Sequence, residues 1–488
     1  MGIEKLFQPG KSAYFVGIKG TGVCAMAELM HEAGIKVRGS DTGEVFYTDA
    51  ILKDRGISYY ENFDRSHITD DIDFIVHSAA YCAQTNVELS QAVKRNIPVI
   101  KYTDALGAWS AGFDSTGIAG VHGKTTVTAI SGVLIKAANI PAQILAGSAV
   151  ADFNGRSTLS LGKKYFVAET CEYRKHFLSF NPKHIILTSV ESDHQDFFPD
   201  YESIRDAFVE YCRLLPEDSG RADGALIYCA DDPGASEAAG IIKKEKPGIA
   251  VIPYGFSALG DYKITSWRAD NERAVFGIAG FPGEFKMKIP GKHQAQNAAA
   301  ALALVLLLLK KEGVTPNAEK IEALKKALEN FKGSKRRSEI IGEAAGIIFM
   351  DDYGHHPTAI KTTLAGIKSF YPSRRLVVSF MSHTYTRTAT LLNEFAGAFT
   401  DADFIFLHKI YASAREKYSG GINGKTLYEK IAQKTENARY TEEPLDAFEP
   451  LTKILKPGDI FITLGAGNNW PLCEKLFCHY KATTGFLT

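Results

Sequence analysis

The sequence predicts an α/β protein built from mostly parallel sheets with flanking helices. Short β-branched runs alternate with longer helical patterns along almost all of the 488 residues, which is typical of parallel α/β architecture. The first unit joins strands at 13–16 and 36–39 through a glycine turn and a helix at about 23–33. Polar residues gather just after the predicted strands, where open α/β sheets bind their ligands.

The length of the chain exceeds what one ordinary core accommodates, so several domains are expected. The loop 110–115 offers one boundary, and a basic stretch at 332–337 precedes a further α/β run. We therefore predict three domains, at 1–112, 113–333 and 334–488. Further strands are expected at 74–77, 99–101, 116–119, 165–168, 185–188, 226–228, 347–350, 376–380, 404–407 and 460–464.

Composition narrows the possible classes of function. Lys+Arg and Asp+Glu number 56 each, so no overall charge favours nucleic acid or an anionic membrane as a partner. The longest apolar run, 298–309, is shorter than the roughly 18 residues that span a bilayer and is interpreted as a buried helix. The N-terminus has no signal-peptide core, and the seven scattered cysteines without a CxxC pair favour reduced thiols. A cytoplasmic protein without membrane or nucleic-acid partners is expected.

The segment GVHGKTT at 120–126 predicts a nucleotide-phosphate site. It lies between a predicted strand and a predicted helix, so backbone N–H groups and a helix N-terminus can converge on phosphate oxygens. The spacing is GxxGK[ST] rather than the usual GxxxxGK[ST], and the alternative is a glycine turn with an exposed lysine. The residues expected to bind ATP here are Gly120, His122, Gly123, Lys124, Thr125 and Thr126.

A magnesium site is expected beside this loop. Mg²⁺ bound to phosphates takes hydroxyl and carboxylate oxygens, which Thr125 and Glu169, at the end of a predicted strand, would supply. His194 in the run VESDHQD could bind a second metal or orient an acceptor. The alternative for His194 is a loop histidine hydrogen-bonded to Asp193 or Asp196.

A second glycine loop, GIKGTG at 17–22, follows the first predicted strand, and Asp41 ends the next one. The pattern is similar to a dinucleotide-binding fingerprint, but its spacing is GxxGxG instead of GxGxxG. Its N–H groups can hold a pyrophosphate at a helix N-terminus. Two phosphate loops on separate sheets predict two phosphorylated ligands. A nicotinamide-dependent dehydrogenase would explain this loop but gives no role to GVHGKTT.

Taken together, these motifs resemble the Mur ligases over nearly the whole chain and in the same order. GVHGKTT resembles GTHGKTT, VESDHQD resembles IEADHxD, and GKHQAQN at 291–297 resembles GxHNxxN. DDYGHHP at 351–357 is a full match, and SHTYTRT at 382–388 resembles PHRYSRT. The resemblance implies a three-domain Mur ligase architecture with a UDP-sugar-binding Rossmann-like domain, a central ATP-binding P-loop domain and a C-terminal Rossmann-like domain for the amino acid.

The resemblance also implies an activity. It is ATP- and Mg²⁺-dependent ligation through an acyl phosphate in peptidoglycan biosynthesis, most closely the joining of L-alanine to the lactyl carboxylate of UDP-N-acetylmuramate. The alternative is a related Mur-type ligase that adds a recycled peptide or another amino acid. A monomer or weak homodimer is expected.

Roles for single residues follow from the resemblance. Those implied for catalysis are Lys124, Glu169, His194, His355 and Arg387. Those implied at the nucleotide, besides the loop 120–126, are His293, Asn297, Arg336 and Asp351. Those implied at the UDP-sugar or the amino acid are Gly17, Lys19, Gly20, Thr21, Gly22, Asp41, Ser78, His355, His356 and Arg387.

Some positions depart from the family pattern or have another interpretation. Lys19, Cys171, Gln294 and Thr384 stand where the family has Gly, Asp, Asn and Arg. The Lys19 side chain could reach the pyrophosphate or point to solvent. Without the resemblance, Arg336 would fit a solvated linker, and His355-His356 before a proline would fit a helix start.

Overall fold

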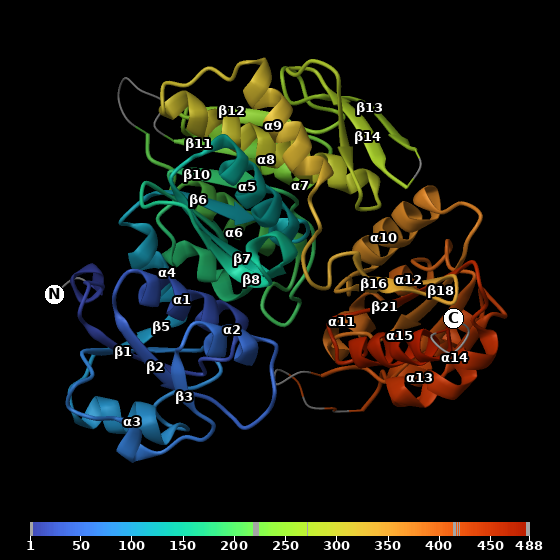
Figure 1. Cartoon of the computed structure of the whole chain (residues 1–488), viewed down its shortest axis with the longest axis horizontal. Helices are drawn as coiled ribbons and strands as arrows, with labels where there is room; N and C mark the ends of the chain where they lie inside the picture. The colour runs from blue at the N-terminus through green and yellow to red at the C-terminus, as the bar shows by residue number, and fades with distance from the viewer. Residues whose placement is uncertain are drawn as a thin grey trace. The chain divides into compact units, whose positions relative to one another are not determined.

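The computed structural model describes residues 3–217, 224–270, 272–412, 416, 418 and 420–484. Its strands form four sheets with helices around them, which confirms the predicted α/β fold (Figure 1). The chain divides into two compact units. The first comprises the residues up to Glu191, Ile204–Tyr254 and Ala300–Leu324; the second comprises Ser192–Ser203, Gly255–Ala299 and the residues from Lys325 onward.

The first sheet, in the first unit, has five parallel strands in the order β3-β2-β1-β4-β5. The order reverses between β1 and β4, so the turn that follows β1 opens at a topological switch point. On one face Tyr14 and Val16 pack against Leu89 and Ala92 of α3. The elements are β1 Ser12–Val16, α1 Thr21–Glu32, β2 Lys36–Ser40, α2 Thr48–Asp54, β3 Ser58–Tyr60, β4 Phe74–His77, α3 Val87–Lys94, β5 Val99–Lys101 and α4 Tyr102–Ser110.

The second sheet has seven strands in the order β12-β11-β10-β6-β9-β7-β8. All neighbours pair in parallel except β7 and β8. Its central strand β6 leads into α5 through the loop 120–123, again at a switch point. The elements are β6 Asp114–Ala119, α5 Lys124–Ala138, β7 Ala142–Val150, β8 Arg156–Ser160, β9 Tyr165–Glu169, β10 His184–Leu187, α6 Tyr201–Cys212, β11 Ala225–Cys229, α7 Pro233–Glu245 and β12 Ala250–Tyr254.

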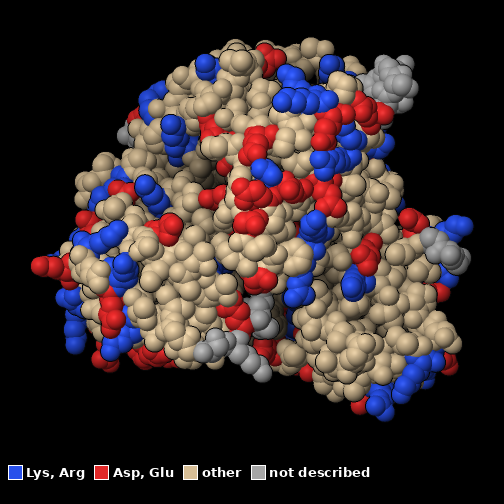
Figure 2. All heavy atoms as spheres, turned by 180° about the vertical axis from the view of Figure 1, so that it is seen from behind, with Lys and Arg blue, Asp and Glu red and all other residues tan. Residues whose placement is uncertain are grey.

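The apolar run 298–309 lies in α8, Lys292–Lys311, whose residues Ala298–Val305 are fully buried. This confirms the interpretation as a buried helix. Within the described ranges no helix combines the length and apolar character that crossing a membrane requires. Charges of both signs occur across the face drawn in Figure 2.

A small antiparallel sheet, β13-β14-β15, and a six-stranded sheet, β16-β17-β21-β18-β19-β20, belong to the second unit. In the larger sheet only β16 pairs antiparallel. The strands are β13 Ile264–Ala269, β14 Ala274–Ile278, β15 Glu284–Met287, β16 Glu339–Ala344, β17 Ile347–Asp352, β18 Arg375–Phe380, β19 Phe404–Leu407, β20 Ala438–Tyr440 and β21 Asp459–Leu464. The remaining helices are α9 Ala318–Glu329, α10 Pro357–Phe370, α11 Tyr385–Thr390, α12 Leu392–Ala396, α13 Gly424–Ala432, α14 Phe448–Ile454 and α15 Trp470–Thr484.

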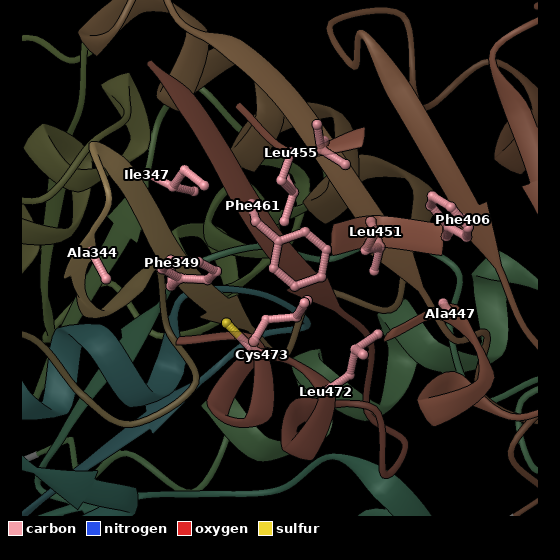
Figure 3. Close-up of a cluster of buried hydrophobic side chains, with 12 residues drawn as sticks. Ala344, Ile347, Phe349, Phe406, Ala447, Leu451, Leu455, Phe461, Leu472 and Cys473 are labelled. Atoms are coloured by element: carbon pink, nitrogen blue, oxygen red, sulfur yellow. The ribbon is translucent and has the colours of Figure 1, made fainter. Parts of the chain in front are cut away.

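One face of the six-stranded sheet carries an aromatic and aliphatic core. Phe349 of β17 and Phe461 of β21 pack against Leu451 of α14 and Leu472 of α15 (Figure 3). Because these strands and helices are far apart in the sequence, their shared core fixes the register of the sheet. It thereby fixes where the polar residues at the carboxyl ends of β17 and β18 emerge.

Each of the four sheets lies within one of the three segments 1–112, 113–333 and 334–488. The two compact units divide the chain in another way, because short segments of the central part belong to the second unit. The three domain boundaries therefore stay a prediction.

Candidate active site

The loop between β6 and α5 has the conformation of an anion-binding turn. Gly120 and Gly123 adopt φ values of 132° and 82°, which favour glycine. A Cβ at Gly120 would lie 2.1 Å from Thr188 Oγ1, so no side chain fits there. The N–H groups of Val121 and His122 donate to Ser189, which holds the loop from the neighbouring strand end. The N–H groups of the first turn of α5 remain directed out of the helix, toward an anion.

Lys124 begins α5 and folds back over this loop. Its Nζ donates to the Gly120 carbonyl oxygen and to Glu172 Oε2, the latter at 2.9 Å. Burial acts to lower the Lys124 pKa, but the charges of Glu172 and Glu169 outweigh it and hold the pKa above its usual value. The ammonium group is therefore charged and faces oxygen ligands, as a lysine that binds a phosphate must.

Glu169 closes β9 and fits a divalent metal. Its Oε2 is buried and has no hydrogen-bond partner within the described residues. A Cβ at Gly147 would lie 2.1 Å from the same atom, so a glycine is required beside the carboxylate. Thr125, also buried, follows Lys124 in the first turn of α5. A hydroxyl and an unsatisfied carboxylate are oxygen donors of the kind that Mg²⁺ takes.

The histidine of the loop has an acidic neighbour. His122 Nε2 contacts Glu191 Oε1, which lies on the segment after β10. Thr126, the last residue of the GVHGKTT motif, is buried in α5. These contacts fix both ends of the loop.

The glycine loop after β1 is held by β2. The N–H groups of Gly17 and Ile18 donate to the Ser40 carbonyl oxygen, and the Lys19 N–H donates to Asp41 Oδ2 at 2.7 Å. Gly17 has a φ of 80°. The loop therefore uses its first N–H groups internally and leaves the start of α1, at Thr21, to face a ligand.

A pocket of about 300 Å³ connects this loop with the Glu169 carboxylate. One side is the first turn of α1, and the other is the end of β9 with the residues that follow it. Tyr102 lies between them, since a Cβ at Gly22 would be 2.7 Å from its hydroxyl. Among the lining residues are Gly20, Thr21, Gly22, Ser78, Tyr102, Glu169 and Cys171. An elongated ligand anchored at α1 can therefore extend toward Glu169.

The second unit places the DDYGHHP motif at the end of β17. Arg336 Nε donates to Asp351 Oδ2 at 2.8 Å, and Arg336 Nη2 donates to the Gly465 carbonyl oxygen. Burial raises the Asp351 pKa, and the Arg336 charge opposes that rise. Asp352 accepts hydrogen bonds from the N–H groups of Ser338 and Gly354. Arg336 is thus part of the site's framework rather than of a solvated linker.

Arg387 is the centre of a buried charged cluster. Its Nε and Nη2 donate to Asp193 Oδ1 at 3.0 and 2.6 Å, and its Nη1 lies 3.0 Å from His383 Nδ1. Burial alone would raise the Asp193 pKa, but the Arg387 charge holds it well below its usual value. The His355 ring lies 5.5 Å from that of His383. Burial and then the Arg387 charge lower the His355 pKa.

The other expected residues of the second unit have defined surroundings. His356 caps α10 by accepting from the Thr358 N–H, as the helix-start alternative predicts, and is buried beside His355. His194 has a φ of 55°, its backbone N–H donates to Asp193 Oδ1, and its ring Nε2 lies 3.8 Å from Asp193 Oδ2. His293 and Asn297 lie in the first turns of α8, and both contact Gln294.

Sequence reasoning missed several residues of these clusters. Glu172, His383 and Tyr102 contact or adjoin residues that had been assigned roles. Asp193 had been considered only as a partner of His194. His383 lies within the motif SHTYTRT, and Glu172 follows Cys171, a position compared with the family pattern, so their place in the sequence was the available signal. Tyr102 had none.

The two glycine turns, the buried lysine and the unsatisfied carboxylate define a nucleotide-dependent enzyme that takes a second phosphorylated ligand. Three family models match the chain: "Mur ligase family, catalytic domain" over residues 12–114, "Mur ligase middle domain" over 118–305 and "Mur ligase, glutamate ligase domain" over 336–467. The chain belongs to the Mur ligase family, whose members are ATP-dependent ligases.

Curated relatives agree with this assignment. UDP-N-acetylmuramate–L-alanine ligase of Treponema pallidum (strain Nichols) is 47% identical over 97% of each chain. The protein of the same name from Borreliella burgdorferi is 37% identical over 96% of this chain and 99% of its own. Among solved structures, UDP-N-acetylmuramate-alanine ligase from Thermotoga maritima matches with a TM-score of 0.75 and 22% identity, covering 97% of this chain and 99% of that one. This last likeness shows the fold.

Proposed function

We propose that this chain joins L-alanine to the lactyl carboxylate of UDP-N-acetylmuramate, with ATP and Mg²⁺, as a cytoplasmic step of peptidoglycan biosynthesis. The observation that carries the proposal is the 47% identity, over 97% of each chain, to a protein named for that reaction. The two phosphate-binding turns support it, since the reaction needs ATP and a nucleotide-sugar. ATP would bind at 120–126, and the sugar diphosphate would bind at 17–22 and α1.

The first half-reaction brings two anions together, the sugar carboxylate and the γ-phosphate of ATP, to form an acyl phosphate and release ADP. Lys124 would exchange its contact with Glu172 for phosphate oxygens and stabilise the charge in transfer. Thr125 and Glu169 would hold Mg²⁺, which supplies further positive charge, and His194 would bind a second magnesium ion. The pocket between α1 and Glu169 supports a sugar anchored at its phosphates with its carboxylate toward the metal.

Beyond the loop 120–126, His293, Asn297, Arg336 and Asp351 are proposed to contact the nucleotide. Asp41 and Ser78 join the 17–22 loop at the UDP-sugar, and His356 adjoins the amino acid. These assignments are consistent with the location of the other residues at strand ends or in the first turns of a helix, and with the hydrogen bond that Arg336 donates to Asp351. Binding measurements on single variants would test them.

The second half-reaction needs a neutral amine on the alanine. His355 Nδ1 lies 3.0 Å from the Tyr353 carbonyl oxygen, to which it donates, so the lone pair is on Nε2. With a lowered pKa the imidazole is neutral near pH 7, so its Nε2 would accept a hydrogen bond from the alanine amine and orient it toward the acyl phosphate. Arg387, oriented by Asp193 and His383, would bind the alanine carboxylate with its one remaining N–H group, on Nη2.

The test is an assay with ATP, Mg²⁺, UDP-N-acetylmuramate and one amine substrate at a time, read by product mass. We expect the alanine adduct, with phosphate released only when all components are present. Glycine and serine test the specificity at the site where Thr384 stands. Replacing Mg²⁺ with other divalent ions tests the choice of metal, and sedimentation tests the expected monomer or weak homodimer.

The same assay tests the alternative, a ligase for a recycled peptide. It is favoured by one observation: a murein peptide ligase from Psychrobacter arcticus has the same fold, with a TM-score of 0.65 and 22% identity over 97% of this chain and 99% of its own. A product with L-alanyl-γ-D-glutamyl-meso-diaminopimelate and none with alanine would replace the first proposal by the second.

A further inference from the structure

Lys19 stands inside the glycine loop that follows β1, and its side chain is buried. Only 1% of the residue is exposed. Lysine is almost never fully buried unless its ammonium group is paired. A buried lysine at this point therefore requires a set of partners, and the structure provides it.

The ammonium group joins three segments. Nζ donates to the carbonyl oxygens of Thr42 and Glu44 at 3.1 and 3.0 Å, in the loop after β2. It lies 3.1 Å from Asp49 Oδ1 at the start of α2 and 3.3 Å from Glu61 Oε1 after β3. These oxygens satisfy the three donors of the ammonium group. The side chain therefore neither faces solvent nor adds a charge to the phosphate turn.

The backbone of the same residue ties the glycine loop to the same region. The Lys19 N–H donates to Asp41 Oδ2, and the Lys19 carbonyl oxygen accepts from Thr48 Oγ1 at 2.6 Å. Asp49 in turn accepts from the Phe46 N–H and from the Tyr59 hydroxyl. The segment 42–49 is thus fixed at both ends relative to the phosphate turn.

The fixed segment places an aromatic residue at the ligand side of α1. The Tyr47 hydroxyl donates to Thr21 Oγ1 at 3.0 Å, and Thr21 lines the pocket that begins at this helix. Tyr47 is 36% exposed, and Val45 and Phe46 beside it are also exposed. Since Lys19 holds the carbonyl groups that precede these three residues, loss of its charge would release them.

We propose that Lys19 is a positioning residue for the nucleotide-sugar: its buried ammonium group holds the segment Thr42–Tyr47 beside the first turn of α1, where Tyr47 borders the bound diphosphate. This rests on the proposed function, which places a UDP-sugar at that turn. Lys19 acts through the segment and does not touch the ligand. Its effect is therefore specific to one of the three substrates.

The test compares Lys19→Met and Tyr47→Phe with wild type. A matched control is Lys11→Met, which removes the lysine just before β1, one paired with Asp73 but 43% exposed in its side chain. We expect Lys19→Met to raise the KM for UDP-N-acetylmuramate by at least about tenfold and to leave the KM values for ATP and alanine within about twofold. Tyr47→Phe, which leaves the buried cluster intact, is expected to raise the same KM by about threefold.

Calorimetric binding of UDP-N-acetylmuramate without ATP separates this inference from the proposed function. Weakened binding in both variants, with wild-type affinity in Lys11→Met, supports the role of Lys19 even if alanine proves not to be the amine substrate. Equal loss of affinity for all substrates in Lys19→Met would overturn it, since that is the signature of general destabilisation. Wild-type affinity in Tyr47→Phe would also overturn it, and this variant decides the matter if Lys19→Met does not fold. No binding to the wild type would refute both proposals.

Discussion

The free energy of unfolding of the second unit is expected to depend on pH because of the buried side chain of His408. The size of this dependence follows from the structure. His408 follows β19 and is 1% exposed. Its Nε2 lies 2.8 Å from Ser379 Oγ and its Nδ1 lies 3.0 Å from Thr441 Oγ1. Burial lowers the His408 pKa from 6.5 to about 4, against smaller opposing effects of Thr441, Glu443 and Asp446.

The direction of the effect follows from linkage. The folded state disfavours the protonated form, so the stabilisation is fully present above pH 6.5 and is lost as the pH falls from 6.5 toward 4. At pH 5 an unfolded chain binds this proton and the folded protein largely does not, which costs about 2 kcal/mol relative to pH 7.5. His408→Gln removes that cost along with the packing of the ring.

We therefore expect His408→Gln to be less stable than wild type at pH 7.5 and the difference to shrink by about 2 kcal/mol at pH 5. The assay is native-state hydrogen exchange of peptides that cover β18 and β19, with rates corrected for pH. The exposed His479 provides the control His479→Gln, for which no such change is expected. A stability difference between wild type and His408→Gln that is the same at both pH values would refute the reasoning.

Three further substitutions test the site. Lys124→Met is expected to lower kcat/KM for ligation by about 10²–10³-fold, because the phosphate charge loses its partner. The control Lys136→Met, at the exposed end of the same helix, should leave kcat/KM unchanged. Activity retained in Lys124→Met would contradict the assignment of Lys124 to the phosphate. Gly147→Ala places a Cβ 2.1 Å from Glu169 Oε2 and should raise the Mg²⁺ concentration for half-maximal activity by about tenfold. The control is Gly240→Ala, where the added Cβ meets no atom within 4 Å. An unchanged Mg²⁺ requirement in Gly147→Ala counts against Glu169 as a ligand. Asp193→Asn leaves the buried Arg387 charge unpaired and should cost about 3–5 kcal/mol in urea unfolding; a loss below 1 kcal/mol would mean that the pair is solvated.

The strands that the sequence predicts best are those buried on both faces. The segments 185–188 and 460–464 are largely apolar, and they belong to the buried strands β10 and β21. The small sheet β13–β15 was not singled out, because β13 is largely exposed and lacks a continuous apolar run. The strand β7, AQILAGSAV, was not singled out either, because it contains several small residues. One of them is Gly147, which leaves room for the Glu169 carboxylate.

The sequence predicts that site residues lie at the ends of strands, but it does not predict which of their side chains contact one another. The placement of Lys124, Glu169 and Asp351 at the ends of elements is visible in the pattern of strands and turns. By contrast, Arg387 and Asp193 are 194 positions apart, and only the fold brings them within hydrogen-bond distance. The side chain of Lys19 could not be placed either, because its partners Asp49 and Glu61 lie on segments whose proximity depends on the packing of α2 and β3.

The division of the chain into two units limits which fragments of the protein contain a complete unit. The polypeptide passes from one unit to the other at five points, after Glu191, Ser203, Tyr254, Ala299 and Leu324. Neither unit is a continuous stretch of sequence, so no single truncation yields one of them whole. A gene fragment that begins between the second and third sheets would contain Arg387 but lack residues 192–203, which carry its counter-ion Asp193. Complementation by two separately expressed halves is therefore expected to fail when the cut separates that segment from the rest of the second unit.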